Sequence, residues 1–201
     1  LGVSSMQIDS PERGFTFKSE GPLDLRLNPN AGVPASQRLW ELTTEEFAGM
    51  LEENSDEPYA DEIALQVMKD LHKGVDISTT TALYKEIELA LANIRMSKEE
   101  RKEALKKSGA RVFQALRIDV NSEFEVLYAF MEKLPKALRP GGRVAVLTFH
   151  SGEDRIVKKA FQAYQRQGIY SEVARDVIRP SKEECFRNSR AHSTKLRWAK
   201  L

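Results

Sequence analysis

The sequence is poor in cysteine and contains no long hydrophobic run. Its one cysteine, Cys185, excludes an intrachain disulfide framework and a cysteine-rich zinc site. No segment approaches the ~18–20 apolar residues that a membrane-spanning helix needs, so we expect no membrane partner. The 201 residues, of which 41% are hydrophobic, suffice for one good-sized domain or two small ones with a packed core.

Two kinds of ligand-binding motif are also missing. A phosphate-binding glycine-rich loop follows a strand, whereas Gly141 and Gly142 precede one and so form a turn. The three histidines, His72, His150 and His192, are scattered along the chain rather than spaced as metal ligands. We therefore expect no metal site.

The formal net charge of +1 hides an uneven distribution. Residues 1–40 carry equal numbers of basic and acidic side chains, residues 41–100 carry 5 basic and 15 acidic ones, and residues 101–201 carry 22 and 11. An asymmetry of this size indicates two surfaces with different partners, and a polyanion suits the basic one.

The first half of the chain divides into a loop and a helical block. Closely spaced glycines and prolines favour a loop over residues 1–40. From Leu42 to about Lys107, apolar residues recur with helical spacing, which predicts a small acidic bundle. We expect four helices there, of which one is capped by Thr43 or Thr44, one spans 58–72, one is opened by Ser78 or Thr79, and a short one follows the capping box Ser97–Glu100.

The second half of the chain has the pattern of an α/β unit. Helical periodicity predicts one long amphipathic helix over 110–138, and the apolar run 143–150 predicts a strand buried on both faces. A helix over 153–167 follows, so this half is typical of a doubly wound parallel sheet. The segments 170–179 and 194–201 alternate apolar and polar residues, which favours edge or antiparallel strands.

Two segments are candidate strand ends that line a ligand site. In an open α/β sheet, ligands bind outside the carboxyl ends of the strands, and segments 1–9 and 148–155 both pass from apolar to small polar residues. His150 is a candidate general base or ligand contact, although a lone histidine at such a position is more often structural. The pair Glu153 and Asp154 is most simply interpreted as favourable charge at a helix N-terminus.

The C-terminal segment carries clustered positive charge. Four cations, Arg187, Arg190, Lys195 and Arg197, lie within eleven residues of one another. Such a cluster suits contacts with phosphates, and a solvated surface is the alternative interpretation.

Several motifs occur together in the order found in one known family. They are LGVSSMQID at 1–9, RGFTF at 13–17, GPLDLR at 21–26, FQALRI with VNSE within 113–123, PGGR at 140–143, HSGEDR at 150–155, and SR with KLR within 189–197. Through them nearly the whole chain resembles the MraW/RsmH family of S-adenosylmethionine-dependent methyltransferases. These enzymes act on N4 of a cytosine in the decoding centre of small-subunit ribosomal RNA.

The resemblance implies a fold and a division of the chain. It implies an α/β class I (Rossmann-like) methyltransferase sheet, present here as its C-terminal portion, with an inserted all-helical subdomain. Residues 38–108 would be this insert, and residues 1–37 and 109–201 would belong to the methyltransferase domain. In the family, a glycine-rich loop and an acidic residue that hold the cofactor precede the motif at 1–9. The resemblance therefore implies an N-terminally truncated form.

The resemblance also implies roles for individual residues. The cofactor would be S-adenosyl-L-methionine, and Gln7 is the only family cofactor contact in this chain. Ser4 and Ser5 are the nearest candidate catalytic acceptors for the cytosine amino group. We expect the cytosine between segments 1–9 and 148–155, and the candidates for RNA contact are Arg13, His150, Arg155, Arg190 and Lys195.

The expected partner is small-subunit rRNA or an assembling small ribosomal subunit. Because Ile169–Pro180 looks most like chloroplast members, we expect either a bacterial cytoplasmic or a chloroplast stromal protein. The alternative is a non-catalytic RNA-binding or ribosome-assembly protein that retains half of the methyltransferase fold.

Overall fold

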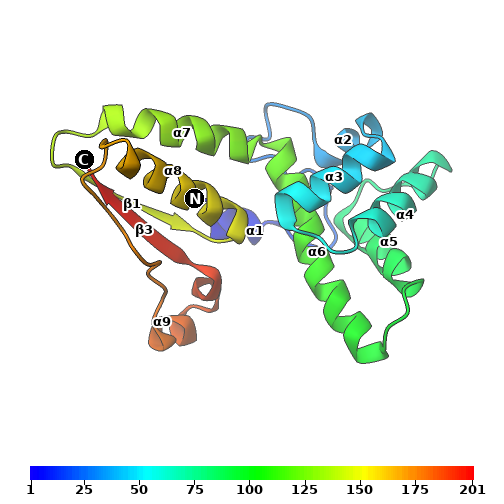
Figure 1. The fold of residues 1–201 in the computed structure, drawn as a ribbon. Coiled ribbons are helices and arrows are strands. Elements are labelled where there is room, and N and C mark those ends of the chain that lie inside the picture. The colour runs from blue at the N-terminus through cyan, green and yellow to red at the C-terminus, as the bar shows by residue number, and fades with distance from the viewer. The chain divides into compact units, whose positions relative to one another are not determined.

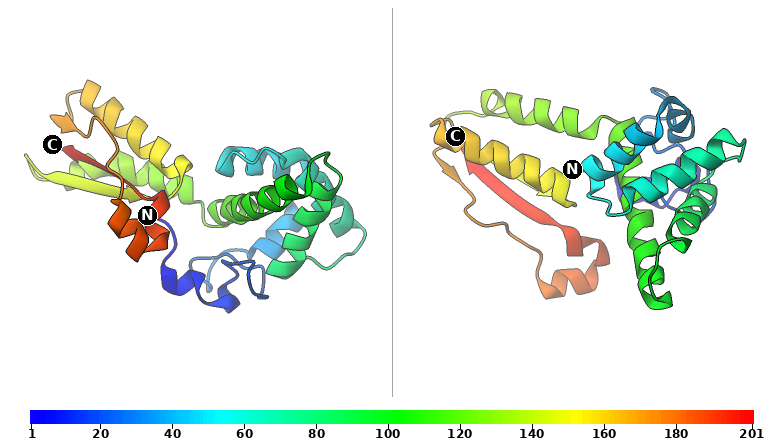
Figure 2. Two further views of the ribbon diagram at one scale, coloured as in Figure 1. Left: turned by 90° about the horizontal axis from the view of Figure 1, so that it is seen from below. Right: turned by 45° about the vertical axis from the view of Figure 1, so that its right-hand side comes forward.

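The computed structural model describes residues 1–201, and the chain forms two compact units. One unit is Val3–Glu123, and the other comprises Leu1–Gly2 together with Phe124–Leu201. Figures 1 and 2 show the helices of the first unit and the small sheet of the second. No helix is both long enough and apolar enough to cross a membrane.

The helical unit contains all four helices that the sequence predicts, but the fourth is long rather than short, and further helices occur within the predicted loop 1–40. Its elements are α1 (Ser5–Ile8), η1 (Pro11–Arg13), α2 (Ala35–Glu41), α3 (Thr44–Ser55), α4 (Ala60–His72), α5 (Thr80–Ala92) and α6 (Lys98–Val120). Side chains of Thr43, Thr79 and Ser97 accept hydrogen bonds from the first turns of α3, α5 and α6. The predicted capping box of α6 is confirmed, and the caps of α3 and α5 are Thr43 and Thr79.

The core of the helical unit lies where α3 packs against α4 and α6, and α4 against α5. Its innermost side chains, each 0% exposed, include Phe47, Leu51, Ile63, Leu83 and Leu116. Leu23 and Leu25 from the loop before α2 join this core with 1% exposure. The N-terminal segment is therefore folded onto the bundle, although it contains little regular structure.

The prediction of one helix over 110–138 is wrong. Helix α6 is a 23-residue helix that ends at Val120, and α7 (Glu123–Ala137) begins after a break. The Asn121 side chain donates to the carbonyls of Leu25 and Arg117 and accepts from the Leu27 N–H, each at 2.8 Å. Ser122 has φ +48°, which an α-helix does not allow. The apolar spacing continues across this break, so periodicity alone does not reveal it.

The second unit contains a small sheet with α7 and α8. Its other elements are β1 (Arg143–Thr148), α8 (Ser151–Arg166), β2 (Glu172–Val173), α9 (Lys182–Arg187), η2 (Ser189–Ser193) and β3 (Lys195–Lys200). The strand order is β1-β3-β2 and both pairings are antiparallel. The predicted strands within 170–179 and 194–201 are confirmed, whereas a parallel pairing is not found among these three strands.

Strand β1 is buried on one face, not on both as predicted. Val146 of β1 and Ala199 of β3 lie in the core with the apolar side chains of α7 and α8. Leu147 points to the opposite face and is 44% exposed. Helices α7 and α8 cover the first face only, so the continuous apolar run of this strand corresponds to one buried and one accessible face.

A buried carboxyl group stands between helices of the helical unit. Glu57, which follows α3, is 3% exposed, and its Oε1 accepts hydrogen bonds from Ser108 Oγ at 2.8 Å and from the Tyr59 N–H at 3.1 Å. The Arg111 guanidinium is 3.9 Å from Oε2. Burial raises the pKa of Glu57 above its usual value, and the hydrogen bond from Ser108 offsets only part of this effect.

Replacing Glu57 by glutamine should change how stability depends on pH. A carboxyl group with a raised pKa stabilises the fold most at low pH, and this contribution is lost as the pH rises through the folded-state value. Glu57→Gln keeps the acceptor for Ser108 without the charge, so the variant should gain stability relative to the wild type as the pH rises above the ordinary pKa of a glutamate. Urea unfolding followed by helical circular dichroism measures this difference.

Glu53, an exposed residue of α3, provides the matched control. Glu53→Gln should leave the pH dependence unchanged. A Glu57→Gln variant that loses stability relative to the wild type over the same rise in pH would show that the buried carboxylate is favourable, against this account.

Candidate functional site

Ser4 caps the short helix α1 near the start of the chain. Ser4 Oγ accepts from the Gln7 N–H at 3.3 Å, and the Ser4 N–H donates to Gln7 Oε1 at 3.0 Å. This reciprocal pair is a capping box for α1. Ser5 is exposed in the first turn and takes no part in the cap. The cap fixes the Gln7 carboxamide so that its Nε2 hydrogens are the group able to donate to a ligand.

Arg13 holds the loop that follows α1. Its Nη2 donates to the carbonyls of Arg26 at 3.0 Å and Leu27 at 2.9 Å, and its guanidinium lies 5.8 Å from the centre of the Phe15 ring. Gly14 has φ +73°, and a Cβ there would collide with the Pro22 carbonyl. Arg13 thus has a structural function within the helical unit, and its contact with RNA stays a prediction.

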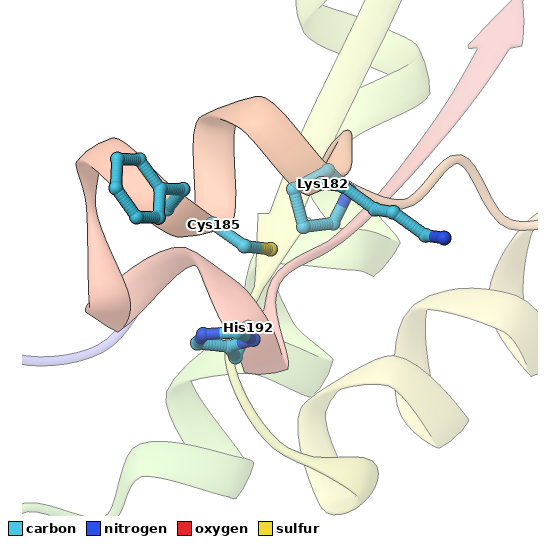
Figure 3. A pocket seen from close by; sticks show the side chains of 5 residues that line it. Lys182, Cys185 and His192 are labelled. Atoms are coloured by element: carbon cyan, nitrogen blue, oxygen red, sulfur yellow. The ribbon is translucent and has the colours of Figure 1, made fainter.

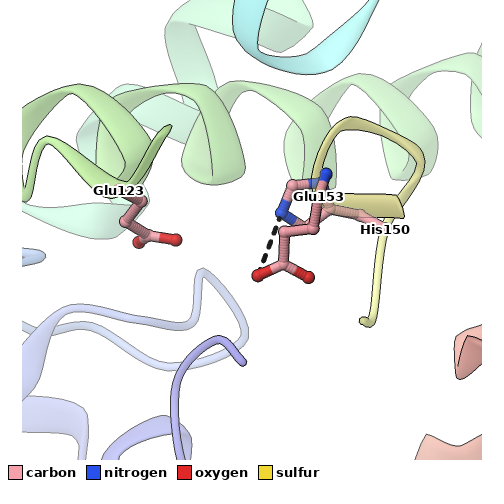
Figure 4. Close-up of side chains that lie close together, drawn as sticks. All are labelled: Glu123, His150 and Glu153. Atoms are coloured by element: carbon pink, nitrogen blue, oxygen red, sulfur yellow. Dashed lines mark hydrogen bonds and ion pairs between the residues drawn. The ribbon is translucent and has the colours of Figure 1, made fainter. Parts of the chain in front are cut away.

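His150 caps α8 in the second unit. Its Nδ1 accepts from the Glu153 N–H at 3.4 Å, while Glu153 Oε2 accepts from the Phe149 N–H at 2.9 Å. Figure 4 shows the short approach of the two side chains, with His150 Nε2 3.6 Å from Glu153 Oε1. Glu153 is only 3% exposed. These contacts favour the structural interpretation of His150, and a role toward a ligand is untested.

The neighbouring Asp154 forms a buried ion pair that the sequence did not reveal. Arg197 Nε donates to its Oδ1 at 2.8 Å and Arg197 Nη2 to its Oδ2 at 3.1 Å, while Lys195 Nζ lies 3.7 Å from Oδ2. Asp154 and Arg197 are 9% and 8% exposed. Burial acts to raise the pKa of Asp154, but the hydrogen bond and charge of Arg197, together with Lys195, hold it below its usual value.

The interpretation of Asp154 as a helix-dipole residue is therefore incomplete. The carboxylate lies in the first turn of α8, where a negative charge is favourable, but it also joins α8 to β3. The two partners are 43 positions apart in the sequence, so no local spacing pattern predicts their contact.

The four cations of the C-terminal segment do not form one surface cluster. Arg197 is buried and Lys195 half-buried beside Asp154. Arg187 is exposed and pairs with Glu183 of its own helix, at 2.6 Å. Arg190 is exposed on η2. Arg197 is therefore not part of an exposed cluster, because its Nε and Nη2 donate to Asp154, and phosphate contact by the other three cations stays a prediction.

The predicted site residues are divided between the two units. Ser4, Ser5, Gln7 and Arg13 belong to the helical unit. His150, Arg155, Arg190 and Lys195 belong to the other, in which His150 caps α8 and Arg155 is exposed within its first two turns. Helix caps place Ser4, Gln7 and His150, and an ion pair places Lys195. The roles assigned to all of the predicted site residues stay predictions.

Removing the charge of Asp154 should destabilise the sheet unit strongly. Asp154→Asn leaves Arg197 buried without its counter-charge, which costs roughly 3–5 kcal/mol in comparable pairs. The Asp154 carboxylate stabilises the folded state above its unfolded pKa and loses this effect on acidification, so the variant should also lack that acid-dependent part. Thermal unfolding at several pH values, followed by the fluorescence of Trp198 in a Trp40→Phe background, measures both effects.

The surface pair of Glu183 and Arg187 provides the control. Glu183→Gln should cost about 0–1 kcal/mol, because both partners are exposed. Equal effects of the two substitutions would contradict the assignment of Asp154 and Arg197 as the central ion pair.

Comparisons with known proteins match this chain along its whole length. The model of a family described as the MraW methylase family matches residues 1–201. A protein of Lachnoclostridium phytofermentans named Ribosomal RNA small subunit methyltransferase H 1 is 61% identical over 199 residues, which are 99% of this chain and 54% of that protein. A protein of the same name from Agathobacter rectalis is also 61% identical over 199 residues, with 99% of this chain and 56% of its own length covered.

A more distant relative extends the comparison. Ribosomal RNA small subunit methyltransferase H of Prochlorococcus marinus (strain MIT 9301) is 40% identical over 201 residues, which are 100% of this chain and 64% of that protein. The chain thus spans about half the length of the two relatives that are 61% identical to it. These three relatives come from bacteria, and a chloroplast location stays a prediction.

Proposed function

Since the chain belongs to the MraW methylase family, we propose that it acts as part of a methyltransferase that modifies small-subunit ribosomal RNA. The methyl group would come from S-adenosyl-L-methionine and would be transferred to N4 of a cytidine. The observation that carries this proposal is the family match over residues 1–201, with 61% identity to relatives named as rRNA small-subunit methyltransferases.

We further propose how the chain contributes to the methyltransferase fold. Residues 1–37 and 109–201 would belong to a Rossmann-like domain, and residues 38–108 would be a helical insert within it. The separate core of α3–α6 supports an insert that folds as a bundle. The compact helical unit, Val3–Glu123, is larger than this insert because the N-terminal loop and all of α6 pack with it.

Residues 1–201 offer a limited part of a cofactor site. The Gln7 carboxamide is oriented by its bond from the Ser4 N–H, and its Nε2 hydrogens fit a carbonyl, carboxylate or hydroxyl oxygen of a ligand. S-adenosylmethionine carries such oxygens and supplies an activated methyl group when bound. We assign Gln7 to hold the cofactor.

Ser4 and Ser5 are the proposed acceptors for the cytosine amino group. This nitrogen is a poor nucleophile because its lone pair is conjugated with the ring, so it must be held at ~3–3.5 Å from the methyl carbon in line with the breaking bond. An acceptor for its N–H would localise the lone pair and receive positive charge as the bond forms. Ser4 Oγ already accepts from the Gln7 N–H, whereas the exposed Ser5 hydroxyl is outside the cap and is the better candidate.

The basic sheet unit is proposed to hold the RNA. The target base must leave its stack to reach a pocket, which requires contacts with the flanking backbone. Arg155 and Arg190 are exposed cations of this unit, and Lys195 is half-buried beside Asp154. Together with Arg13 and His150, they are the candidates for substrate contact.

Transfer of labelled methyl groups to purified small ribosomal subunits tests this function. Gln7→Glu keeps the acceptor oxygen that caps α1 but removes the amide donor, so the fold should be retained while affinity for S-adenosylmethionine falls about two- to tenfold, the range of one hydrogen bond. Calorimetry and the KM for the methyl donor provide the two measurements.

Gln167→Ala, at the exposed C-terminal end of α8, is the matched control and should leave both values unchanged. Wild-type binding of the RNA without methyl transfer would favour the alternative, a non-catalytic RNA-binding or ribosome-assembly protein. Normal cofactor affinity of the Gln7→Glu variant would remove Gln7 from the cofactor site.

A further inference from the structure

A cavity lies between two short helical elements of the sheet unit. It has a volume of about 530 Å³ and is lined by Pro180, Lys182, Cys185, Phe186 and His192. Figure 3 shows Lys182 and Cys185 extending from α9 and His192 from η2 around it. The volume lies within the range of roughly 300–1,000 Å³ that small-molecule sites occupy in proteins.

The frame of this cavity is held by local hydrogen bonds. Ser181 Oγ accepts from the Glu184 N–H at 3.0 Å and caps α9, while Asn188 Oδ1 accepts from the Arg190 N–H at 3.1 Å and caps η2. Ala191 of η2 is 5% exposed, so one side of this element is packed against the rest of the sheet unit. The two elements pack against each other, and the residues that line the cavity come from both of them and from Pro180.

Phe186 contributes almost nothing to the core of the protein. Its side chain is 92% exposed, more than the other exposed large hydrophobic residues, such as Met6 at 81% and Tyr128 at 61%. A phenyl ring in water gains free energy when it stacks on another flat apolar surface. A ring at the edge of this open cavity is thus placed to stack on a planar ligand.

The surroundings of the cavity are positively charged. Residues 175–201 carry eight lysines and arginines against three acidic residues, although Lys195 and Arg197 are engaged by Asp154 and Arg187 by Glu183. Arg175, Arg179 and Lys182 are exposed in this segment. Positive side chains interleaved with an exposed aromatic ring are the combination by which proteins bind single-stranded nucleic acids, because the cations contact phosphates and the ring stacks on a base.

The same observations disfavour other ligands. A membrane-binding helix needs a long apolar face, whereas α9 has six residues and one large exposed apolar side chain. In a double-stranded RNA, the bases are stacked inside the helix and cannot reach the ring. A single-stranded segment with a free base face fits the cavity, the ring and the charge together.

We propose that this cavity binds an unpaired base of single-stranded RNA, stacked on Phe186, with Lys182 on an adjacent phosphate. The proposal rests on the proposed function, since it identifies the cavity as a site for an RNA segment. His192 lines the other side of the cavity and would limit the size of the base that enters. No chemistry takes place there, and the site serves to position the RNA strand.

Binding of a short fluorescent single-stranded RNA to the chain, followed by anisotropy over a range of salt concentrations, tests the proposal. Phe186→Ala should weaken binding about tenfold, the effect of losing one stacked base, without changing the salt dependence. Phe186→Trp should restore it, because tryptophan stacks on a base at least as well. Lys182→Gln should weaken binding and reduce the slope of log K against log salt by about one.

Tyr128→Ala provides the matched control, since Tyr128 is an exposed aromatic residue of α7 away from the charged segment. It should leave the affinity for RNA unchanged. Photocrosslinking of RNA that carries 4-thiouridine, with mass spectrometry of the peptides, should place the crosslink within Pro180–His192.

Three results would overturn the proposal. The first is equal RNA affinity of Phe186→Ala and wild type, and the second is an equal loss of affinity on Tyr128→Ala. The third is a Phe186→Ala variant that loses binding to anionic phospholipid vesicles while its affinity for RNA is unchanged. Failure of the proposed function gives a different result from failure of this site. A wild-type protein that binds RNA through Phe186 but transfers no methyl group would contradict the enzymatic function and still support the RNA site.

Discussion

The ion pair of Asp154 and Arg197 is the interaction on which the organisation of the sheet unit depends. It joins the first turn of α8 to the central strand β3. The preceding residue, Glu153, donates its backbone N–H to the side chain of His150, which caps α8. One buried contact thus joins the start of α8 to β3, the strand that follows α9 and η2. Because both partners are nearly buried, each needs the other, and the loss of one charge leaves its partner without compensation.

The two units differ in electrostatics as well as in architecture. The helical unit, Val3–Glu123, carries 15 basic and 22 acidic side chains, whereas Phe124–Leu201 carries 16 and 8. Within the basic part, Arg197 and Lys195 are engaged by Asp154, whereas other cations are exposed both on α7 and α8 and near α9 and η2. The net charge of the chain therefore says little about its partner, whereas the exposed cations of the sheet unit favour a polyanion.

The features predicted correctly from the sequence are those that depend on a few adjacent residues. The caps at Thr43 and Ser97 and the helices they open follow from local hydrogen bonds, and the family motifs indicate the family that the whole-length match shows. The errors concern contacts between distant residues. Asn121 breaks the predicted long helix because it binds the backbone of Leu25 and Leu27, and Asp154 pairs with Arg197 from another strand. The sequence does not indicate a role for Phe186, because a single aromatic residue in a polar segment forms no helical or strand periodicity with other apolar residues.

Nucleoside analysis of ribosomal RNA tests the central claim most directly. Small subunits that lack the modification would be incubated with S-adenosylmethionine and the full-length protein that contains residues 1–201. The RNA would then be digested and examined by mass spectrometry. The account predicts a new N4-methylated cytidine that is absent when the methyl donor is left out. Methylation at a ring carbon, methylation of another base, or no methylated product at all would contradict it.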